Sequence, residues 1–509
     1  MSNSMVLVVG AGPTGMTAAI ELRRAGFDVR IVDKSAHLAE HSQALVVQAR
    51  TLEQFQRYGI AEQTVAHGRR LSGARFFSDG KEIVHLTLDK IASRYPFALL
   101  IPQSETEALL NAKMEALGAR TERGVSLAGF TQGDGAVHAT LLHADARTEQ
   151  VTVRWLIGCD GAHSTVRQLA GIPFEGGGVG ISFFLGDVEL EGPDAPQDEL
   201  TIHVRHGDLV FLGRLNDRLV RLIVARHPRD GEDEPKQLTE ADFQRAVDEV
   251  GVRVHVRKGE WMTPFHVRDM QSKQYRVGGA FLAGDASHIH SPVGGQGMNT
   301  GIQDAANLVW KLAAVARGAN DDLLDSYDQE RGEVGKALLR FTERGLKLAT
   351  AANPVLTGAR DALAPLLVGL EPVQRAAMGF VSETAIEYRS SSIVADRGGD
   401  GELRAGDRLP DLPLRAADGP ATLLQNWKEA RHVAFVVDGG GAGIDALRTK
   451  LPHADVAAVN AADLDEDGRR LLGKEPKLLI LRPDGYVGYR GRLKDEAGWA
   501  AYARQDALG

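Results

Sequence analysis

The 509-residue sequence predicts a multidomain α/β protein: a mostly parallel sheet with helices, an antiparallel sheet inserted into it, and a small second α/β domain at the C-terminus. Three observations carry this prediction. The chain begins with a strand, glycine turn, helix and strand in succession, which is a βαβ unit. Short β-prone runs separated by polar turns follow between residues 175 and 275, and strands alternate with helix-like stretches again after residue 420.

Composition limits the classes of protein that remain. Hydrophobic residues make up 43% and charged residues 25%, which is typical of folded domains. The net charge of −9 gives no electrostatic case for a nucleic-acid partner. No apolar run reaches the roughly 18 residues that a membrane-spanning helix needs, and the first residues lack the basic segment of a signal peptide. We therefore expect a cytoplasmic protein with no membrane partner.

The N-terminal βαβ unit carries a phosphate-binding pattern. Gly10-Ala11-Gly12-Pro13-Thr14-Gly15 fits G-x-G-x-x-G between an apolar strand and a helix, and the second strand ends at Asp33, followed by Lys34. Such glycines permit a tight turn and a close approach of the backbone to a pyrophosphate at the helix N-terminus. The acid after the second strand can accept hydrogen bonds from a ribose. A dinucleotide site is predicted here, although this turn alone does not distinguish FAD from NAD.

Two further motifs follow predicted strands. Asp160-Gly161 comes after one, and Gly284-Asp285 comes after another. The second leads through the glycine-rich run 292–299 into a predicted helix from about 300 to 315. Carboxylates at strand ends and glycine-rich loops before a helix are arrangements that bind polar and flat groups of a nucleotide.

These three motifs, in this order, resemble those of the group A flavoprotein monooxygenases, the family of para-hydroxybenzoate hydroxylase and phenol hydroxylase. Ala49–Glu53 and Ile101–Glu107 match the family as well. The resemblance implies a Rossmann-like FAD-binding domain over residues 1–174 and 276–396, with a substrate-binding sheet inserted at 175–275. It also implies that FAD is bound by residues of all these motifs: Gly10, Gly12, Pro13, Thr14, Gly15, Asp33, Lys34, Arg50, Gln103, Val125, Asp160, Gly161, Gly284, Asp285, Pro292, Gly295, Gly297, Met298 and Asn299.

The C-terminal part resembles one branch of that family. Glycines and prolines across 397–420 predict a linker, and the run 478–490 resembles the thioredoxin-like domain of pentachlorophenol monooxygenase and aromatic polyketide hydroxylases. Cys159 is the single cysteine of the chain, so this domain, expected over 421–509, has no CxxC pair and cannot exchange disulfides. A structural role is expected, with a homodimer interface as one option.

The resemblance also implies the chemistry. FAD would be reduced by NADPH or NADH and would react with O2, and the resulting flavin hydroperoxide would hydroxylate a phenolic or other electron-rich aromatic substrate. No second glycine fingerprint is present for the nicotinamide nucleotide, as is usual in this family. Leu45 stands where phenol hydroxylase-like members have an aspartate, and Gln43 stands where many members have an arginine.

Substrate activation is therefore expected from the inserted sheet, where a cation can stabilise a phenolate or a carboxylate. Arg221 is the first choice as a catalytic residue on the substrate side, because it lies within an apolar strand. The other candidates are His203, Arg205, Arg214 and His227.

Alternative functions remain open at this point. Another FAD enzyme on the same fold is possible, such as a halogenase, a reductase or a Baeyer–Villiger-type oxygenase, and so is a flavin-binding protein without catalysis. The tryptophans at 155, 261, 310, 427 and 499 form no W-x-W pair, which disfavours a halogenase. His288 and His290 lack companion ligands in sequence, so no metal is expected. Cys159 is expected to be a small core residue.

Overall fold

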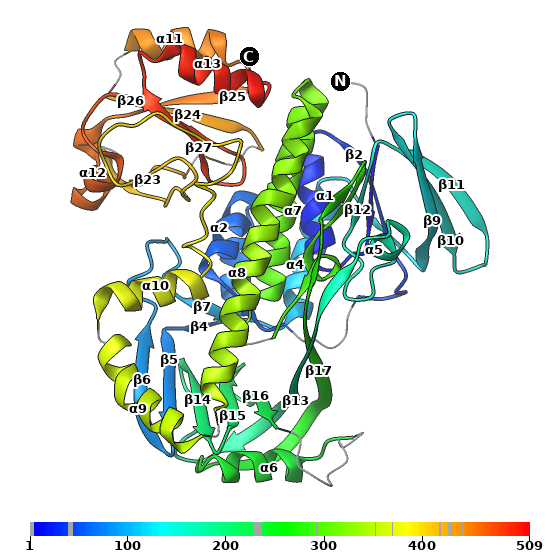
Figure 1. Cartoon of the computed structure of the whole chain (residues 1–509), viewed down its shortest axis with the longest axis vertical. Coiled ribbons are helices and arrows are strands. Elements are labelled where there is room, and N and C mark those ends of the chain that lie inside the picture. The colour runs from blue at the N-terminus through cyan, green and yellow to red at the C-terminus, as the bar shows by residue number, and fades with distance from the viewer. Residues whose placement is uncertain are drawn as a thin grey trace.

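The computed structural model describes residues 5–38, 44–227, 237–291, 294–351, 353–368, 370–416, 419–425, 427, 430–438 and 441–508. Gln43 and Pro292 therefore lie outside the described residues. Figure 1 shows two bodies, a large N-terminal part built around two sheets and a smaller C-terminal domain beside it.

A six-stranded sheet forms the base of the N-terminal part, with the order β18-β19-β12-β1-β2-β8. Its strands are β1 (Met5–Val9), β2 (Asp28–Asp33), β8 (Thr121–Arg123), β12 (Trp155–Gly158), β18 (Arg276–Val277) and β19 (Ala280–Leu282). β1 pairs in parallel with β2 and β12, and β12 pairs in parallel with β19. Because the carboxyl ends of parallel strands share one edge, the residues after β1, β2, β12 and β19 meet there.

Helices and a small meander cover this sheet. α1 (Pro13–Arg24), α4 (Gln103–Ala116) and α7 (Gly297–Arg317) pack on one face, and nearly every α7 residue from Asn299 to Val315 is buried. A three-stranded meander with α5 (Thr165–Leu169) forms a second core with the sheet; its strands are β9 (Val125–Gly133), β10 (Ala136–His143) and β11 (Thr148–Val153). The short helix η1 (Gly284–Ala286) follows β19 directly.

An antiparallel-rich sheet of eight strands lies at the far end of the N-terminal part (Figure 1), with the order β20-β17-β13-β16-β15-β14-β5-β6. Its strands are β5 (Gly73–Ser78), β6 (Lys81–Thr87), β13 (Phe174–Glu191), β14 (Glu199–Arg205), β15 (Asp208–Arg214), β16 (Leu219–Arg226), β17 (His255–Ser272) and β20 (His288–Ile289). The predicted segment 175–275 supplies most of them. β5, β6 and β20 come from outside that segment, and β5 joins the sheet by pairing in parallel with β14.

The two faces of this sheet have different partners. α6 (Glu240–Glu249) covers one face, and a Cβ on Gly186 would lie 2.7 Å from the Phe243 ring of that helix. The opposite face packs on the end of the long helix α8 (Asp325–Ala349) through Leu346. α9 (Pro354–Val368) and α10 (Glu371–Val381) contact β6. Figure 1 shows the long strands β13 and β17 running together between the two sheets.

A small sheet and short helices connect these layers. β3 (Val46–Val47), β7 (Ala98–Leu100) and β4 (Arg69–Leu71) form a three-stranded sheet, with α2 (Ala49–Tyr58) and α3 (Ala61–His67) beside it in the chain. η2 (Asp321–Leu324) precedes α8. Among the described helices, none combines the length and the apolar character that crossing a bilayer requires.

The C-terminal domain has a five-stranded sheet in the order β21-β27-β26-β24-β25. Its strands are β21 (Ala395–Asp396), β24 (His432–Val437), β25 (Ala454–Val459), β26 (Lys477–Leu481) and β27 (Val487–Arg492), and its helices are α11 (Gly441–Lys450), η3 (Ala461–Asp463), α12 (Glu466–Leu472) and α13 (Glu496–Gln505). β22 (Pro413–Ala416) and β23 (Gly419–Thr422) form a small hairpin. The predicted linker 397–420 is partly packed, because Leu403, Leu409 and Leu412 are buried in this domain's core.

Candidate flavin site

The glycine turn after β1 holds α1 close to the sheet. Gly10 has φ +100° and donates its N–H to the Val32 carbonyl at 2.8 Å. A Cβ on Gly15 would lie 1.9 Å from the Gly10 carbonyl oxygen, so no larger residue fits there. Gly12, by contrast, has no neighbour within 4 Å of its Cβ position, and α1 begins after it without a side-chain cap. This open turn, with uncapped helix N–H groups, fits a pyrophosphate.

The acid at the end of β2 fixes the same turn. Asp33 accepts hydrogen bonds from the N–H groups of Ala11 and Ser35, each at 2.7 Å. Each carboxylate oxygen keeps a second lone pair, so a ribose hydroxyl can still bind. Lys34 beside it is exposed, and a weak contact from Gly124 N–H to the Ser35 carbonyl at 3.4 Å brings the start of β9, at Val125, to this edge.

Three motifs distant in sequence touch at Gly284. A Cβ on Gly284 would lie 2.6 Å from Oγ1 of Thr14 in the glycine turn. A Cβ on Gly301 of α7 would lie 2.3 Å from the same Thr14 oxygen and 3.1 Å from Cα of Gly284. The first turn of α1, the end of β19 and the first turns of α7 are therefore packed at backbone contact.

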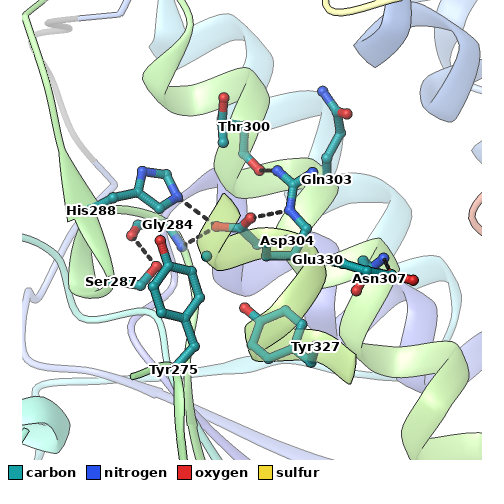
Figure 2. A network of polar contacts seen from close by, with 12 residues as sticks. Tyr275, Gly284, Ser287, His288, Thr300, Gln303, Asp304, Asn307, Tyr327 and Glu330 are labelled. Carbon is teal, nitrogen blue, oxygen red and sulfur yellow. Dashed lines mark hydrogen bonds and ion pairs between the residues drawn. The ribbon is translucent and has the colours of Figure 1, made fainter. Parts of the chain in front are cut away.

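A buried carboxylate on α7 ties these elements together (Figure 2). Asp304 Oδ2 accepts from Gly284 N–H at 3.0 Å and pairs with His288 Nε2 at 2.8 Å, and Oδ1 accepts from Arg331 Nε at 2.6 Å. Arg331 also donates to the Thr300 carbonyl at 3.1 Å. Burial acts to raise the pKa of Asp304, but the charges of Arg331 and His288 outweigh it and lower that pKa. Sequence analysis missed Asp304 and Arg331, because their partners lie far away in the chain.

Asp285 stands apart from its neighbours. Gly284 and Ala286 are buried, whereas Asp285 is exposed, and within the described residues its carboxylate makes no hydrogen bond. Protein surrounds it closely enough that desolvation raises the pKa of this carboxyl, while His288 acts in the opposite direction. An open acceptor beside the glycine turn suits the ribityl hydroxyls of a flavin.

The glycine-rich loop before α7 is fixed by Asn299. Asn299 accepts from Gln48 N–H at 2.9 Å and donates to the carbonyls of Val46 and Gly295 at 2.8 and 2.7 Å. Its buried side chain is therefore fully used, and contact with a cofactor would be left to the backbone. Gly295 has φ +62°, and a Cβ there would lie 2.9 Å from Val46. α7 begins with Gly297 and Met298, and no side chain among the described residues caps the N–H groups of this first turn.

The Asp160-Gly161 motif has a capping role in the structure. Asp160 accepts from Ser164 Oγ at 2.5 Å and from Thr165 and Val166 N–H at 2.6 and 3.2 Å, so its carboxylate caps α5. Gly161 supplies the turn with φ +78°. The sequence analysis did not foresee this capping role, and the assignment of Asp160 to cofactor binding stays a prediction. The spacing of Asp160 ahead of a Ser-Thr pair was the available signal for a helix cap.

Arg50 has partners that the sequence analysis did not predict. Its buried guanidinium pairs with Glu53 at 2.8 Å, donates to the Asp484 carbonyl and lies 5.2 Å from the Tyr486 ring centroid. These partners belong to α2 and the C-terminal domain, so Arg50 links the two parts of the protein, and its contact with the cofactor stays a prediction. Gln103, in contrast, begins α4 and accepts from Ala44 N–H at 3.2 Å, next to the site edge.

On the substrate side, Arg221 faces the N-terminal sheets. It lies opposite Gly213 in the β15–β16 register, and the Cβ position of Gly213 is 3.4 Å from Leu100 of β7. Arg221 pairs with Asp187 of β13, Nη2 to Oδ2 at 2.9 Å, and lies 5.4 Å from the Trp261 ring centroid. Arg221 is thus a neutralised, nearly buried cation, whereas the Asp187 side chain keeps 18% of its surface exposed.

The other sheet candidates have separate partners. His203 stacks on Phe77 with 4.5 Å between ring centroids, and burial lowers its pKa to about 4. Arg205 pairs with Asp79 on the surface, Arg214 donates to the Pro196 carbonyl at 2.7 Å, and His227 contacts the Thr350 carbonyl at 3.3 Å. The structure therefore does not bring these side chains together with Arg221.

Neither the histidine pair nor the cysteine forms a reactive centre. His288 is bound to Asp304, and no cluster of three metal-ligating side chains occurs among the described residues. His290 contacts the Ser291 carbonyl at 3.0 Å, and burial lowers its pKa to about 4. Burial raises the pKa of the Cys159 thiol well above its ordinary value, which leaves it protonated and unreactive.

Comparison with known families decides what this edge binds. A family profile described as an FAD binding domain matches residues 3–342, and one described as the C-terminal domain of aromatic-ring hydroxylases matches residues 402–508. The chain belongs to the FAD-dependent aromatic-ring hydroxylases. The predicted Rossmann-like FAD domain and thioredoxin-like C-terminal domain of this hydroxylase are confirmed.

Curated relatives and solved structures agree with this assignment. The hydroxylase is 33% identical to 6-methylpretetramide 4-monooxygenase of Streptomyces rimosus, over 96% of this chain and 90% of the relative. It is 30% identical to pentachlorophenol 4-monooxygenase of Sphingobium chlorophenolicum, over 99% and 93%. The solved structure of the anhydrotetracycline hydroxylase OxyS from Streptomyces rimosus superposes with a TM-score of 0.82 at 30% identity, covering 99% of this chain and 98% of that one. The hydroxylase is therefore an FAD-dependent monooxygenase of phenolic or other electron-rich aromatic compounds, as the sequence predicted.

Proposed function

We propose that this hydroxylase binds FAD along the carboxyl edge of the six-stranded sheet and uses NADH or NADPH and O2 to hydroxylate a phenol-type ring. The observation that carries the proposal is the open Asp285 carboxylate, which lies beside the glycine turn and the uncapped start of α7. Bound FAD would supply the redox chemistry, taking electrons from the nicotinamide nucleotide and activating O2.

Each group of residues has a defined task toward the cofactor. The N–H groups after Gly12 hold the pyrophosphate, Asp33 holds a ribose, and Asp285 accepts hydrogen bonds from the ribityl chain. The backbone of the loop from Gly295 to Met298 borders the flat ring, and the α7 dipole favours negative charge there. Gln103 and the backbone at Val125 border the same edge.

We assign the substrate to the space between the proposed flavin site and the face of the eight-stranded sheet that carries Arg221 and Gly213. The contact of Gly213 with Leu100, and the pairing of Leu100 with Val46, link this face to the glycine-rich loop. Apolar side chains on the same face exclude water, which strengthens the polar contacts made there. Asp187, held by Arg221, accepts a hydrogen bond from a substrate hydroxyl, so Arg221 is a positioning residue in this proposal.

The decisive experiment uses the purified protein. We expect the absorbance of oxidised flavin, oxidation of NADH or NADPH that phenols stimulate, and a hydroxylated product that contains oxygen from 18O2. A protein that is colourless and fails to rebind FAD would contradict the cofactor site. Bound flavin with no phenol-stimulated oxidation, across a panel from simple phenols to polycyclic ones, would contradict the proposed reaction.

A further inference from the structure

A cavity lies beside the first turn of α7. It encloses about 290 Å3 between the first turn of α7, the middle of α8 and the segment 380–391. Its wall is mostly apolar, with Val334, Ala337, Leu338, Phe380 and Ile386. None of the cofactor-side residues assigned above except those of the α7 start borders it, so this cavity is distinct from the proposed substrate space.

The polar floor of this cavity is Glu383, in an unusual backbone conformation. Glu383 has φ +60°, a region that glycine adopts freely and other residues adopt at a cost. It is 2% exposed, accepts from Thr300 Oγ1 at 2.9 Å and bonds the Gln303 amide. Burial raises the pKa of this carboxyl to about 8, against the hydrogen bond from Thr300 and the charge of Arg331, so at neutral pH it is a hydrogen-bond donor as well as an acceptor.

A second polar group in the wall lacks a partner. Gln296 is 1% exposed and donates its amide to the Phe380 carbonyl at 3.0 Å. Within the described residues its Oε1 atom is buried and makes no hydrogen bond. A buried acceptor left unpaired is unfavourable, so a ligand that donates a hydrogen bond here would be favoured.

Size and charge restrict the ligand. A volume near 300 Å3 is at the small end of ligand pockets and suits a single ring. The exposed rim carries little net charge, because Glu333 pairs with Lys336 and Glu387 pairs with Arg389. The buried part of the lining carries the carboxyls of Glu330 and Glu383 and, among the described residues, no cation, which disfavours carboxylates and phosphates. An apolar wall with one acceptor and one neutral carboxyl suits a ring that carries a hydroxyl group.

We propose that this cavity is a second binding site, separate from the substrate space, for a neutral single-ring phenol, with Gln296 and Glu383 as its polar anchors. The site shares Gln296 and Thr300 with the first turn of α7, which borders the glycine-rich loop on its other side. A ligand in this cavity would therefore contact α7, the helix whose first turn borders the proposed flavin site. This proposal goes beyond the hydroxylation reaction and requires no turnover.

Photolabelling of the purified holoenzyme with 4-azidophenol tests the proposal in solution. We expect labels on peptides that contain residues 334–338 and 380–386, and excess phenol should suppress them at least fivefold while benzoate does not. Ala337→Trp fills the cavity and should abolish these labels, whereas Lys336→Trp, on an exposed neighbour, should keep them. Ile386→Trp would fill the same cavity from its opposite wall, and it replaces Ala337→Trp in the test if that variant does not fold.

Labelling confined to the eight-stranded sheet or the glycine-rich loop would overturn the second site. So would cavity labels that persist in both filled variants. Because labelling needs no reaction, a protein that labels in the cavity but fails to hydroxylate phenols would contradict only the proposed function.

Discussion

Glu330 of α8 and Arg482 of the C-terminal domain form a two-point ion pair with no access to water. Oε1 and Oε2 of Glu330 meet Nη1 and Nη2 of Arg482 at 2.7 and 2.9 Å, and both side chains are at most 1% exposed. Lys311 adds a third charge, with Nζ 2.8 Å from Glu330, and burial lowers its pKa to about 8. Burial acts to raise the pKa of Glu330, but Arg482 and Lys311 outweigh it and lower that pKa. The C-terminal domain is therefore a fixed part of the fold.

Arg482→Met should destabilise the holoenzyme by about 3–5 kcal/mol, because it leaves the buried carboxylate of Asp484 without its cation and that of Glu330 with Lys311 alone. Thermal unfolding followed by circular dichroism measures the effect. Arg375→Met is the matched control, since Arg375 pairs with Glu371 on the surface at 2.7 Å and should change stability by under about 1 kcal/mol. Equal shifts for the two variants would show that the interface pair is unimportant.

Gly301→Ala should weaken FAD binding by pushing α1 away from α7, because the added Cβ would lie 2.3 Å from Thr14 Oγ1. Thr14→Ala removes that oxygen, which leaves the Thr14 Cβ at 3.5 Å and a tighter contact with the Gly284 Cα at 3.1 Å. The double variant should therefore recover much of the flavin content, measured as flavin absorbance per protein. If the double variant binds no more flavin than Gly301→Ala alone, this contact does not set the helix spacing.

Asp285→Ala should lower flavin content at least tenfold, since the open acceptor of the cofactor edge is lost. The control is Asp322→Ala, an exposed acid in η2 far along the chain from the glycine motifs. Titration of apoprotein with FAD, followed by the quenching of flavin fluorescence, gives the affinities. Wild-type affinity in Asp285→Ala would remove Asp285 from the cofactor site.

The sequence could predict the parts of this site that depend on local geometry. Gly10, Gly15 and Asp33 act within one βαβ unit, so their spacing alone located the turn. The role of Arg50 was not predictable, because its partner at Asp484 lies more than 400 residues away. The capping role of Asp160 was not predicted, because a carboxylate after a strand can face a ligand or cap the next helix, and sequence does not separate the two roles.

Arg221→Ala should slow phenol-stimulated oxidation of NAD(P)H at least tenfold while flavin content stays near that of the wild type. The substitution releases Asp187, which we assign to the substrate hydroxyl, and mainly KM should rise if positioning is lost. Arg214→Ala, on the neighbouring strand and bound only to backbone carbonyls, is the control. Unchanged kcat and KM in Arg221→Ala would show that this ion pair only supports the sheet.

Glu383→Gln should stabilise the protein increasingly as pH rises from 5 to 8. The folded-state pKa of Glu383 is about 8 and the ordinary value is 4.5, so the folded state holds a proton that the unfolded chain has released across this range. The stabilisation that comes from this protonated carboxyl is fully present below about pH 4.5. It falls by up to about 1.4 kcal/mol per pH unit until about pH 8, a total on the order of 5 kcal/mol. Arg331 and Asp304 are the charged groups that face it, and the substituted amide would remain neutral throughout. Urea unfolding at pH 5, 6.5 and 8 measures the effect, and the difference in unfolding free energy between Glu383→Gln and wild type should grow with pH. Glu333→Gln, at an exposed acid of α8, is the control and should show no such growth. A constant difference for Glu383→Gln would show that Glu383 is ionised in the folded protein.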